Sequence, residues 1–441
     1  MTHRLLPLAA LAVVLAACDR PLIDEIPPDL AVVSPDLSLV QLDPEVTLSV
    51  SANALNGIER VRIGGLDAVF DADTQLWEAD VFLSQGTNVV LIEAFATDDT
   101  ARQDTAYAVH LPLEVESPPA AVLPEPRSGH TATRLSGRTI LLAGGATTDG
   151  RVLGSARILT DAENAFSVGA PIELQTPRVG HTATRLLDGR ILLLGGTSTP
   201  DPGGASTFVT SPEVYDPRTQ TASPVRLGGE PIQRVNHIAT HLTRDNREYV
   251  YVYGGQTPGP NTPATLQIAE LRSGSGIDSL VTRTPAGGAS GGTPLPDPTQ
   301  WIVGSAVREV TAVETGLEPG AGLPVGRARR TLFSLPGTVF IPFSVNPAGI
   351  GLPQQPRSSA DGDVVSGLAL LAGGVSPSGE TLGSLEAYSD RAGRWVGFPP
   401  ALSLRPRQGH TVTLTQSGRI LAIGGRGPSG QPLATLDVLS F

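Results

Sequence analysis

Four of the seven histidines in this chain recur in one short motif, and histidine suits both metal binding and acid-base catalysis at neutral pH. In each copy an arginine lies three residues before the histidine, and in three copies a glycine lies directly before it. The four histidines are His130, His181, His237 and His410. The recurrence allows two interpretations, a shared chemical role or a structural contact that each copy repeats.

A pair of glycines closes each of the four copies, after a short apolar run such as residues 191–194 or 249–253, and a fifth pair occurs at Gly373. The pairs are Gly144 and Gly145, Gly195 and Gly196, Gly254 and Gly255, Gly373 and Gly374, and Gly424 and Gly425. A repeat length of about 50 residues with a fixed strand pattern is typical of a propeller. The apolar runs predict strands that are buried on both faces, and the glycines predict close backbone approach with positive φ.

The wider motif resembles the kelch repeat, which forms four-stranded propeller blades. The resemblance rests on His-Thr-Ala-Thr at residues 130–133 and 181–184, on Asp-Gly-Arg at 188–190 and on residues 213–217, and it covers residues 114–441. It implies an all-β fold, a kelch-type β-propeller.

The number of blades depends on the long interval between Gly255 and Gly373, which is about two repeat lengths. A divergent copy at residues 327–331, followed by an apolar run at 339–341, would place Ser344 and Val345 where the other copies have glycines. Either this blade carries insertions on both sides, or the pair at Gly373 belongs to an interrupted form of the same blade. We therefore expect six blades, or five if the two segments belong together.

The two ends of the repeat region predict how the ring closes. After the last glycine pair the chain supplies one more strand, residues 436–441, which corresponds to the third strand of a blade. Residues 113–123 can provide the missing fourth strand. Closure of this kind leaves only short, protected sheet edges.

The N-terminus resembles a bacterial lipoprotein signal. A basic start and an apolar stretch, together residues 1–17, precede Cys18, which is the only cysteine of the chain. The apolar run is shorter than the roughly 17 residues that a transmembrane helix needs. We expect cleavage before Cys18, lipid on its sulfur and a tether over residues 18–28. This predicts a protein of the bacterial cell envelope, held at the membrane by a lipid anchor.

Residues 29–112 show alternating strands between turn signals, which indicates a small β-sandwich. The turn phrases resemble those of bacterial immunoglobulin-like modules. Four aspartates, Asp71, Asp73, Asp98 and Asp99, suit either solvated turns or a calcium loop. The propeller is then expected over residues 113–441.

Composition limits the partners and the loops. The net charge of −12 argues against nucleic-acid binding, since phosphate contacts need a basic surface. Two stretches rich in glycine or polar residues, 272–300 and 346–363, are expected to be loops inserted between strands.

Catalysis finds little support in the residue pattern. Equivalent histidines on different blades are far apart, so we expect them to be structural and hydrogen-bonded to backbone near blade junctions. Galactose oxidase, a copper enzyme with kelch blades, joins a tyrosine to a cysteine in its cofactor, and Cys18 leaves no cysteine for that role. We expect no cofactor, no metal and no catalytic residue.

The favoured hypothesis is a non-enzymatic binding or scaffold module for an envelope or extracellular protein. The alternative is a carbohydrate-active enzyme with an unrecognised carboxylate pair in the propeller mouth.

Overall fold

Every regular element of the described chain is a β-strand. The computed structural model describes residues 27–118, 122–162, 165–200, 207–244, 247–253, 256–258, 266–273, 278–283, 299–306, 309–317, 324–334, 339–341, 361–366, 368–376, 378–389 and 391–441. Within those ranges no helix is long and apolar enough to cross a membrane. The all-β class predicted from the sequence is confirmed for this part of the chain.

The N-terminal strands form two four-stranded sheets. One has the order β1 (Asp29–Ser34), β2 (Glu45–Asn53), β6 (Leu76–Phe82), β5 (Val69–Asp71). The other has the order β4 (Leu66–Asp67), β3 (Ile58–Ile63), β7 (Gly86–Ala96), β8 (Ala101–His110). Along β7, buried Val90, Ile92, Ala94 and Ala96 alternate with more exposed residues. This period of two marks a sheet with one covered face.

Two compact units share the chain. Of the described residues, the first unit contains 27–35, 47–81 and 90–106, and the second contains 36–46, 82–89 and those from Tyr107 onward. In the second unit, the segment at 36–46 packs beside the strand that ends at Gly397: the Val40 amide donates to the Gly397 carbonyl at 2.7 Å. Val40 itself lies in a buried cluster with Leu368 and Leu370.

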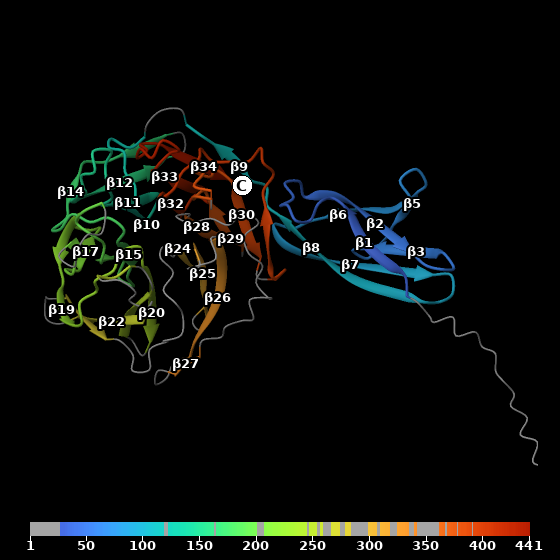
Figure 1. Ribbon diagram of the computed structural model, residues 1–441, viewed down its shortest axis with the longest axis horizontal. Helices are drawn as coiled ribbons and strands as arrows, with labels where there is room; N and C mark the ends of the chain where they lie inside the picture. The colour runs from blue at the N-terminus through green and yellow to red at the C-terminus, as the bar shows by residue number, and fades with distance from the viewer. Residues whose placement is uncertain are drawn as a thin grey trace, which may run out of the picture. The chain divides into compact units, whose positions relative to one another are not determined.

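Six further sheets lie in the second unit and follow one another along the chain (Figure 1). The first sheet contains β10 (Thr131–Arg134), β11 (Thr139–Ala143), β12 (Ser155–Asp161) and β13 (Phe166–Val168), with β14 (Ile172–Glu173) also paired to β12. The second contains β15 (Thr182–Arg185), β16 (Ile191–Leu194), β17 (Glu213–Asp216) and β18 (Thr221–Pro224). The third contains β20 (Ile238–Arg244), β21 (Arg247–Tyr253), β22 (Leu266–Ser273) and β23 (Asp278–Arg283), with β19 (Arg226–Gly229) parallel to β23. The last three contain β24 (Thr299–Ala306), β25 (Glu309–Leu317), β26 (Pro324–Ser334) and β27 (Val339–Ile341); β28 (Asp361–Val365), β29 (Leu368–Ala372), β30 (Leu385–Ser389) and β31 (Arg394–Gly397); and β32 (Thr411–Leu414), β33 (Ile420–Ile423), β34 (Leu436–Ser440) and β9 (Glu114–Glu116).

The first strands of these sheets contact one another in a closed cycle. β10 contacts β15 and β32, β15 contacts β20, β20 contacts β24, β24 contacts β28, and β28 contacts β32. Figure 1 shows these strands on the inside of the ring, with later strands such as β14 and β19 farther out. The second unit is therefore β-propeller-like.

The apolar second strands hold neighbouring sheets together. All four residues of β16 are buried: Ile191 and Leu193 pack in a cluster with the β10–β13 sheet, whereas Leu192 and Leu194 pack with the β20–β23 sheet. A strand covered on both faces needs apolar residues at every position. The sequence prediction for this run is confirmed.

The ring closes through the two distant segments predicted from the sequence. β9 pairs antiparallel with β34, with Val115 opposite Leu439. The amides of Val122 and Leu123 both donate to the Ala434 carbonyl at 2.9 Å. The last sheet therefore takes its outermost strand from before the first repeat, and no long edge of β34 is left open.

The divergent copy was placed wrongly. Residues 327–331 lie inside β26, the third strand of its sheet and not the first, while Ser344 and Val345 lie outside the described residues. That copy lacks both the histidine and the glycines that distinguish a first strand, so the apolar pattern alone could not fix its position. Gly373 follows β29, which belongs to a different sheet from β26. The divergent copy and the glycine pair at Gly373 are therefore not parts of one sheet.

The expected loop at 272–300 is also corrected in part. Its residues 278–283 form β23, which pairs with β22 and with β19. Residues 284–298 lie outside the described residues, as do most of those between 346 and 363. The sequence pattern did not indicate this strand because Asp278, Ser279 and Thr282 are polar, and a strand far from the centre of the ring needs few apolar side chains.

Candidate functional site

The described repeat residues meet where neighbouring sheets join. We use the term repeat junction for the place where the glycine pair of one sheet meets the arginine and histidine of the next sheet. Cys18, Gly254 and Gly255 lie outside the described residues. The remaining predicted positions are His130, Gly144, Gly145, His181, Gly195, Gly196, His237, Gly373, Gly374, His410, Gly424 and Gly425, and all of them are described.

The glycine pairs are required by close backbone contact. Gly144 and Gly145 have φ values of 61° and 97°, and the Gly145 amide donates to the Arg178 carbonyl at 2.9 Å. A Cβ on Gly144 would lie 2.3 Å from that carbonyl oxygen and 2.9 Å from His181 Cε1. The same amide-to-arginine hydrogen bond recurs from Gly196, Gly374 and Gly425, to Arg234, Arg407 and Arg127. Both predicted reasons for glycine, positive φ and close approach, are confirmed.

The repeat histidines link each sheet to the next through threonine. His181 Nε2 shares a hydrogen bond of 3.1 Å with Thr131 Oγ1, and His237 Nε2 one of 3.0 Å with Thr182 Oγ1. Across the closure of the ring, His130 Nε2 lies 3.1 Å from Thr411 Oγ1. These contacts lie at the junctions, and they join each histidine to a side-chain hydroxyl, where the sequence led us to expect backbone. The motif contains that partner, because Thr131, Thr182 and Thr411 each directly follow a repeat histidine.

Burial keeps these imidazoles neutral. Desolvation is the main cause that lowers the pKa of His130 and His181 well below the ordinary value, and the neighbouring Arg127 and Arg178 lower it further. For His237 the pKa falls to about 3, again chiefly through burial. A neutral ring that shares a hydrogen bond with a threonine acts as a connector between sheets. In the described part of the chain, no group of three or more His, Cys, Asp or Glu residues is placed to hold a metal ion.

The repeat arginines form a second layer that was not predicted as a site. Arg127, Arg178 and Arg407 are fully buried, and Arg234 is nearly so. In the second repeat, Arg178 forms a buried ion pair with Glu213, which begins β17. Glu213 also accepts hydrogen bonds from the amides of Gln175 and Thr176, at 2.8 and 2.9 Å. Burying a guanidinium requires such a partner, since an unpaired buried charge is strongly unfavourable.

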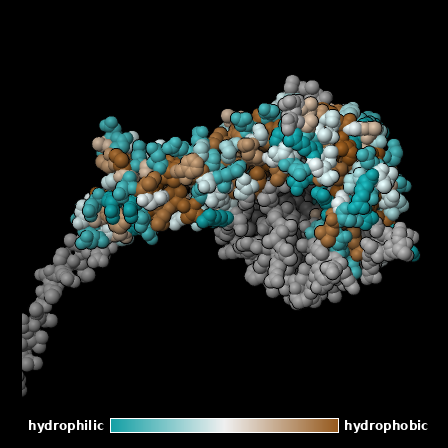
Figure 2. All heavy atoms as spheres, turned by 180° about the vertical axis from the view of Figure 1, so that it is seen from behind, coloured by the Kyte–Doolittle hydropathy of each residue, from teal (hydrophilic) through white to brown (hydrophobic). Residues whose placement is uncertain are grey.

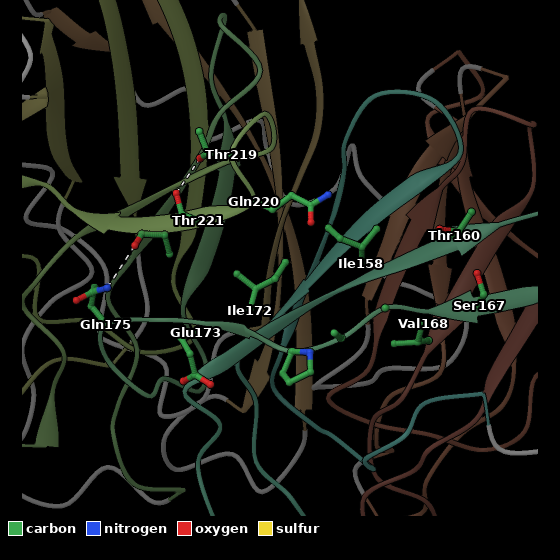
Figure 3. A pocket seen from close by; sticks show the side chains of 14 residues that line it. Ile158, Thr160, Ser167, Val168, Ile172, Glu173, Gln175, Thr219, Gln220 and Thr221 are labelled. Carbon is green, nitrogen blue, oxygen red and sulfur yellow. Dashed lines mark hydrogen bonds between the residues drawn. The ribbon is translucent and has the colours of Figure 1, made fainter.

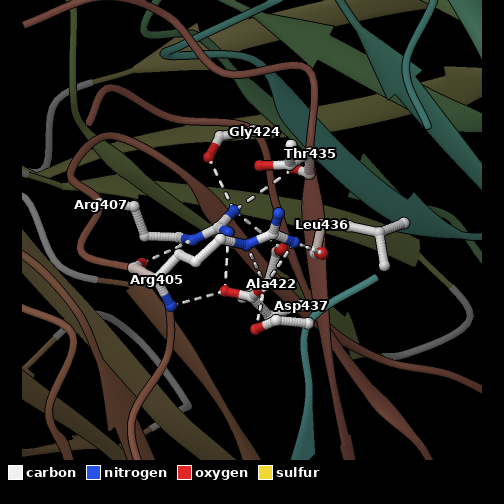
Figure 4. A network of polar contacts seen from close by, with 8 residues as sticks. Arg405, Arg407, Ala422, Gly424, Thr435, Leu436 and Asp437 are labelled. Carbon is white, nitrogen blue, oxygen red and sulfur yellow. Dashed lines mark hydrogen bonds and ion pairs between the residues drawn. The ribbon is translucent and has the colours of Figure 1, made fainter. Parts of the chain in front are cut away.

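The last repeat shows the same arrangement in more detail (Figure 4). Asp437 Oδ2 accepts from Arg407 Nη2 at 2.7 Å, and Asp437 Oδ1 accepts from Arg405 Nε at 2.7 Å. Arg407 Nη1 donates to the carbonyls of Ala422 and Gly424 at 3.1 and 3.0 Å. One arginine therefore connects the strand before the glycine pair, the pair itself and the third strand of the sheet. The acidic residue in the third strand was the feature of the sequence from which this arginine site could have been predicted.

A groove lies on the outer rim between the first two sheets (Figure 3). We call it the rim groove. Its volume is about 840 Å³, and its walls include Ile158, Val168 and Ile172 on one side and Thr219, Thr221 and Ala222 on the other. The Gln175 side chain donates to the Ala222 carbonyl at 3.3 Å and ties the two walls together. No repeat signal marks this groove, because the residues that line it are not shared between copies.

The aspartates of the first unit belong to turns. The Asp71 carboxylate accepts from the Asp73 amide and the Thr74 hydroxyl, both at 2.9 Å. Asp98 accepts from the Thr100 hydroxyl at 2.6 Å and from Asn56 at 2.9 Å. These hydrogen bonds lower the pKa of both carboxyls, for Asp71 mainly through the Asp73 amide and for Asp98 mainly through Thr100. Of the two interpretations, the turn is the one that these contacts support.

Comparison with solved structures places the fold in a class. The chain is similar to a protein whose structure is titled "Structure of YjhT", with a TM-score of 0.50 and 14% sequence identity over 72% of this chain and 96% of that chain. At this identity the likeness concerns the fold alone, and it supports the β-propeller-like class defined above. No protein-family model matches the chain, and no curated protein matches it either.

Proposed function

We propose that this chain is a lipid-anchored protein of the bacterial envelope that presents a six-bladed kelch propeller as a binding module for a protein partner. In this proposal the six sheets of the second unit are the blades, and the two N-terminal sheets form an immunoglobulin-like module. The repeated motif of an arginine three residues before a histidine and the closed cycle of six sheets, each of four or five strands, support the kelch assignment.

Anchoring rests on the sequence around Cys18. A basic start, an apolar stretch and small residues before the single cysteine are the features of a lipoprotein signal. Replacement by Cys18→Ser should leave the protein unprocessed and move it out of the detergent phase in Triton X-114 partition. Unchanged partition would remove the anchor from the proposal.

The rim groove is the observation that carries the binding function. Ile158 and Ile172 give it a half-buried apolar floor, while Gln175, Thr219 and Gln220 supply exposed polar groups at its border. Figure 3 shows these side chains gathered between strands of two different sheets. An apolar floor with a polar border suits an extended polypeptide segment, whose backbone finds hydrogen bonds and whose side chains find contact area.

The repeated residues of the ring are used in structural contacts. The histidines and glycines of the motif contact the neighbouring sheet, and the arginines pair within their own sheet, so the variable outer residues remain for recognition. On the face shown in Figure 2, hydrophobic and hydrophilic side chains are interspersed over the described residues.

A photo-crosslinker at Gln220 tests the proposal in the full-length, membrane-bound protein. The matched control carries the same crosslinker at Ser429, an exposed turn residue outside the groove. We expect one discrete protein adduct from Gln220, lost when Ala170 is replaced by Arg at the groove border. Equal adducts from both positions, or none, would contradict the proposal. Hydrolysis of an envelope oligosaccharide by the purified protein would instead favour an enzyme.

A further inference from the structure

One position in the third strand has a recurring chemistry in the sheets that carry a glycine pair. It lies opposite the residue two places before the glycine pair. In four sheets this position is acidic or an amide: Glu213 opposite Leu193, Gln267 opposite Val252, Glu386 opposite Leu371 and Asp437 opposite Ala422. In the β10–β13 sheet the same position, opposite Leu142, is occupied by Arg157. A cation therefore stands where the other described repeats place a hydrogen-bond acceptor.

That acceptor serves the buried arginine of its own repeat. Arg407 donates to Asp437 at 2.7 Å, Arg234 Nε donates to Gln267 Oε1 at 2.9 Å, and Arg178 pairs with Glu213. The three contacts come from one register position, so the fold presents an acceptor at the same point each time. In the first repeat, Arg127 is equally buried, but the residue at that register position is Arg157.

The first repeat draws its only nearby carboxylate from a different place. Glu125 lies two residues before Arg127, where the last repeat has Arg405, so acid and base have exchanged positions between the two repeats. The exchange does not restore the contact. Glu125 Oε2 is 3.8 Å from Arg127 Nη2, and the Glu125 side chain is 32% exposed while that of Arg127 is 0% exposed. In the last repeat the corresponding contact is a hydrogen bond of 2.7 Å.

Buried polar atoms of both signs lack a hydrogen bond in the first repeat, including the acceptor Glu125 Oε2, whereas of the Arg178 guanidinium in the second repeat only Nε does. Among the described residues, Arg127 Nε, Arg127 Nη2 and Arg157 Nε are buried and make no hydrogen bond. The hydrogen bonds that these side chains do make go to carbonyls, from Arg127 to Gly144 at 3.4 Å and from Arg157 to Gly169 at 2.9 Å. Burial lowers the pKa of Arg127 to about 10; Glu125 opposes this change and Arg157 adds to it. Arg127 remains charged at neutral pH, and buried donors of this kind are normally satisfied.

We propose that Arg127 and Arg157 bind a small carboxylate anion at the place where the other repeats carry their own carboxylate or amide. In the second and last repeats the acceptor at this position is a carboxylate, that of Glu213 or Asp437. A planar ligand with two oxygens therefore fits the donors of the first repeat. Arg157 is only partly buried and Glu125 is partly exposed, so both side chains reach the protein surface beside the buried Arg127. This inference does not depend on the proposed partner of the rim groove.

Thermal unfolding of the full-length protein in acetate, at constant ionic strength against chloride, tests the site. We expect acetate to raise the melting temperature saturably by a few degrees, as a ligand of the folded state does. Arg157→Glu should restore the internal pair, raise the melting temperature without acetate and abolish the acetate response. The matched control Arg151→Glu makes the same charge change at an exposed turn and should keep the response.

Two further variants keep the test decisive. Glu125→Gln removes the competing carboxylate, so acetate should bind several-fold more tightly and restore the lost stability. Arg157→Gln removes one cation without introducing an acid, and it should weaken acetate binding measured directly by isothermal titration calorimetry. Equal effects of acetate and chloride on the parent would overturn the proposal. An acetate response that survives Arg157→Glu, or a response to inorganic phosphate alone, would also overturn it.

Discussion

The repeat junctions and the rim groove lie in the same ring of sheets but use sequence in opposite ways. At the junctions the same few atoms recur: a glycine amide on an arginine carbonyl, a histidine on a threonine, an arginine on a third-strand acceptor. In the groove, Ile158, Ile172 and Thr221 have no such recurring contact. What recurs within the chain therefore joins neighbouring sheets or, in the arginine contact, connects the parts of one sheet. Recognition is expected where the repeats differ.

The largest effect expected at the junctions is the loss of a buried counterion. Asp437→Ala would leave Arg407 fully buried with no carboxylate and would also release Arg405. Breaking a buried ion pair from one side costs about 3–5 kcal/mol. The control Asp43→Ala removes an exposed acid and should change stability by less than about 0.5 kcal/mol. Urea unfolding of both variants measures the difference, and similar small losses would show that Asp437 does not stabilise the junction.

Steric contact at the glycine pair is expected to come next. In Gly144→Ala the new Cβ would meet the Arg178 carbonyl at 2.3 Å, and the backbone already has a φ of 61°. Gly137→Ala is a matched control with a φ of 65° and nothing within 4 Å. The control should lose about 1–2 kcal/mol from backbone strain alone, and Gly144→Ala about 2 kcal/mol more. Equal losses in urea unfolding would mean that close approach plays no part.

Acid should weaken the junctions before it affects the groove. The folded-state pKa of His130, His181 and His237 lies below the unfolded value, so their stabilising contribution is complete above about pH 6.5 and is lost as the pH falls. Each histidine that stays neutral should cost about 2 kcal/mol between pH 7 and pH 5. The slope of unfolding free energy against pH measures the number of protons taken up. His237→Gln should reduce that number by one, and a pH-independent stability would refute the assignment.

Local patterns were enough to predict much of the ring. Buried β16 and the positive φ at Gly144 and Gly145 follow from short-range apolar and glycine signals, and the closing strand β9 from the strand that the last repeat lacks. The all-β, β-propeller-like class followed from their repetition. Lipidation at Cys18 and the immunoglobulin-like assignment stay predictions.

The parts that sequence did not predict depend on contacts between distant segments. Asp437 meets Arg407 only because strand register brings two positions 30 residues apart into contact. The strand at 327–331 was misplaced because it lacks the histidine and glycines that identify a first strand. The rim groove requires the turn after Asp216 to lie beside Ile172, and that depends on the packing of two sheets.

The smallest expected effect on stability is also the sharpest test of the comparison. Ala170 is an exposed residue of the rim groove and belongs to no repeat junction, so Ala170→Arg should change the unfolding free energy by no more than about 0.5 kcal/mol. The same substitution would fill part of the groove and should eliminate the adduct formed from a crosslinker at Gln220. Ser429→Arg makes an identical change of charge and size elsewhere and should leave both quantities unaltered. A large loss of stability in Ala170→Arg would mean that the groove wall supports the ring as the junctions do. A stable Ala170→Arg protein that still forms the adduct would mean that the partner binds elsewhere. Either result would contradict the separation of the repeat junctions, which stabilise the ring, from the rim groove, which binds the partner.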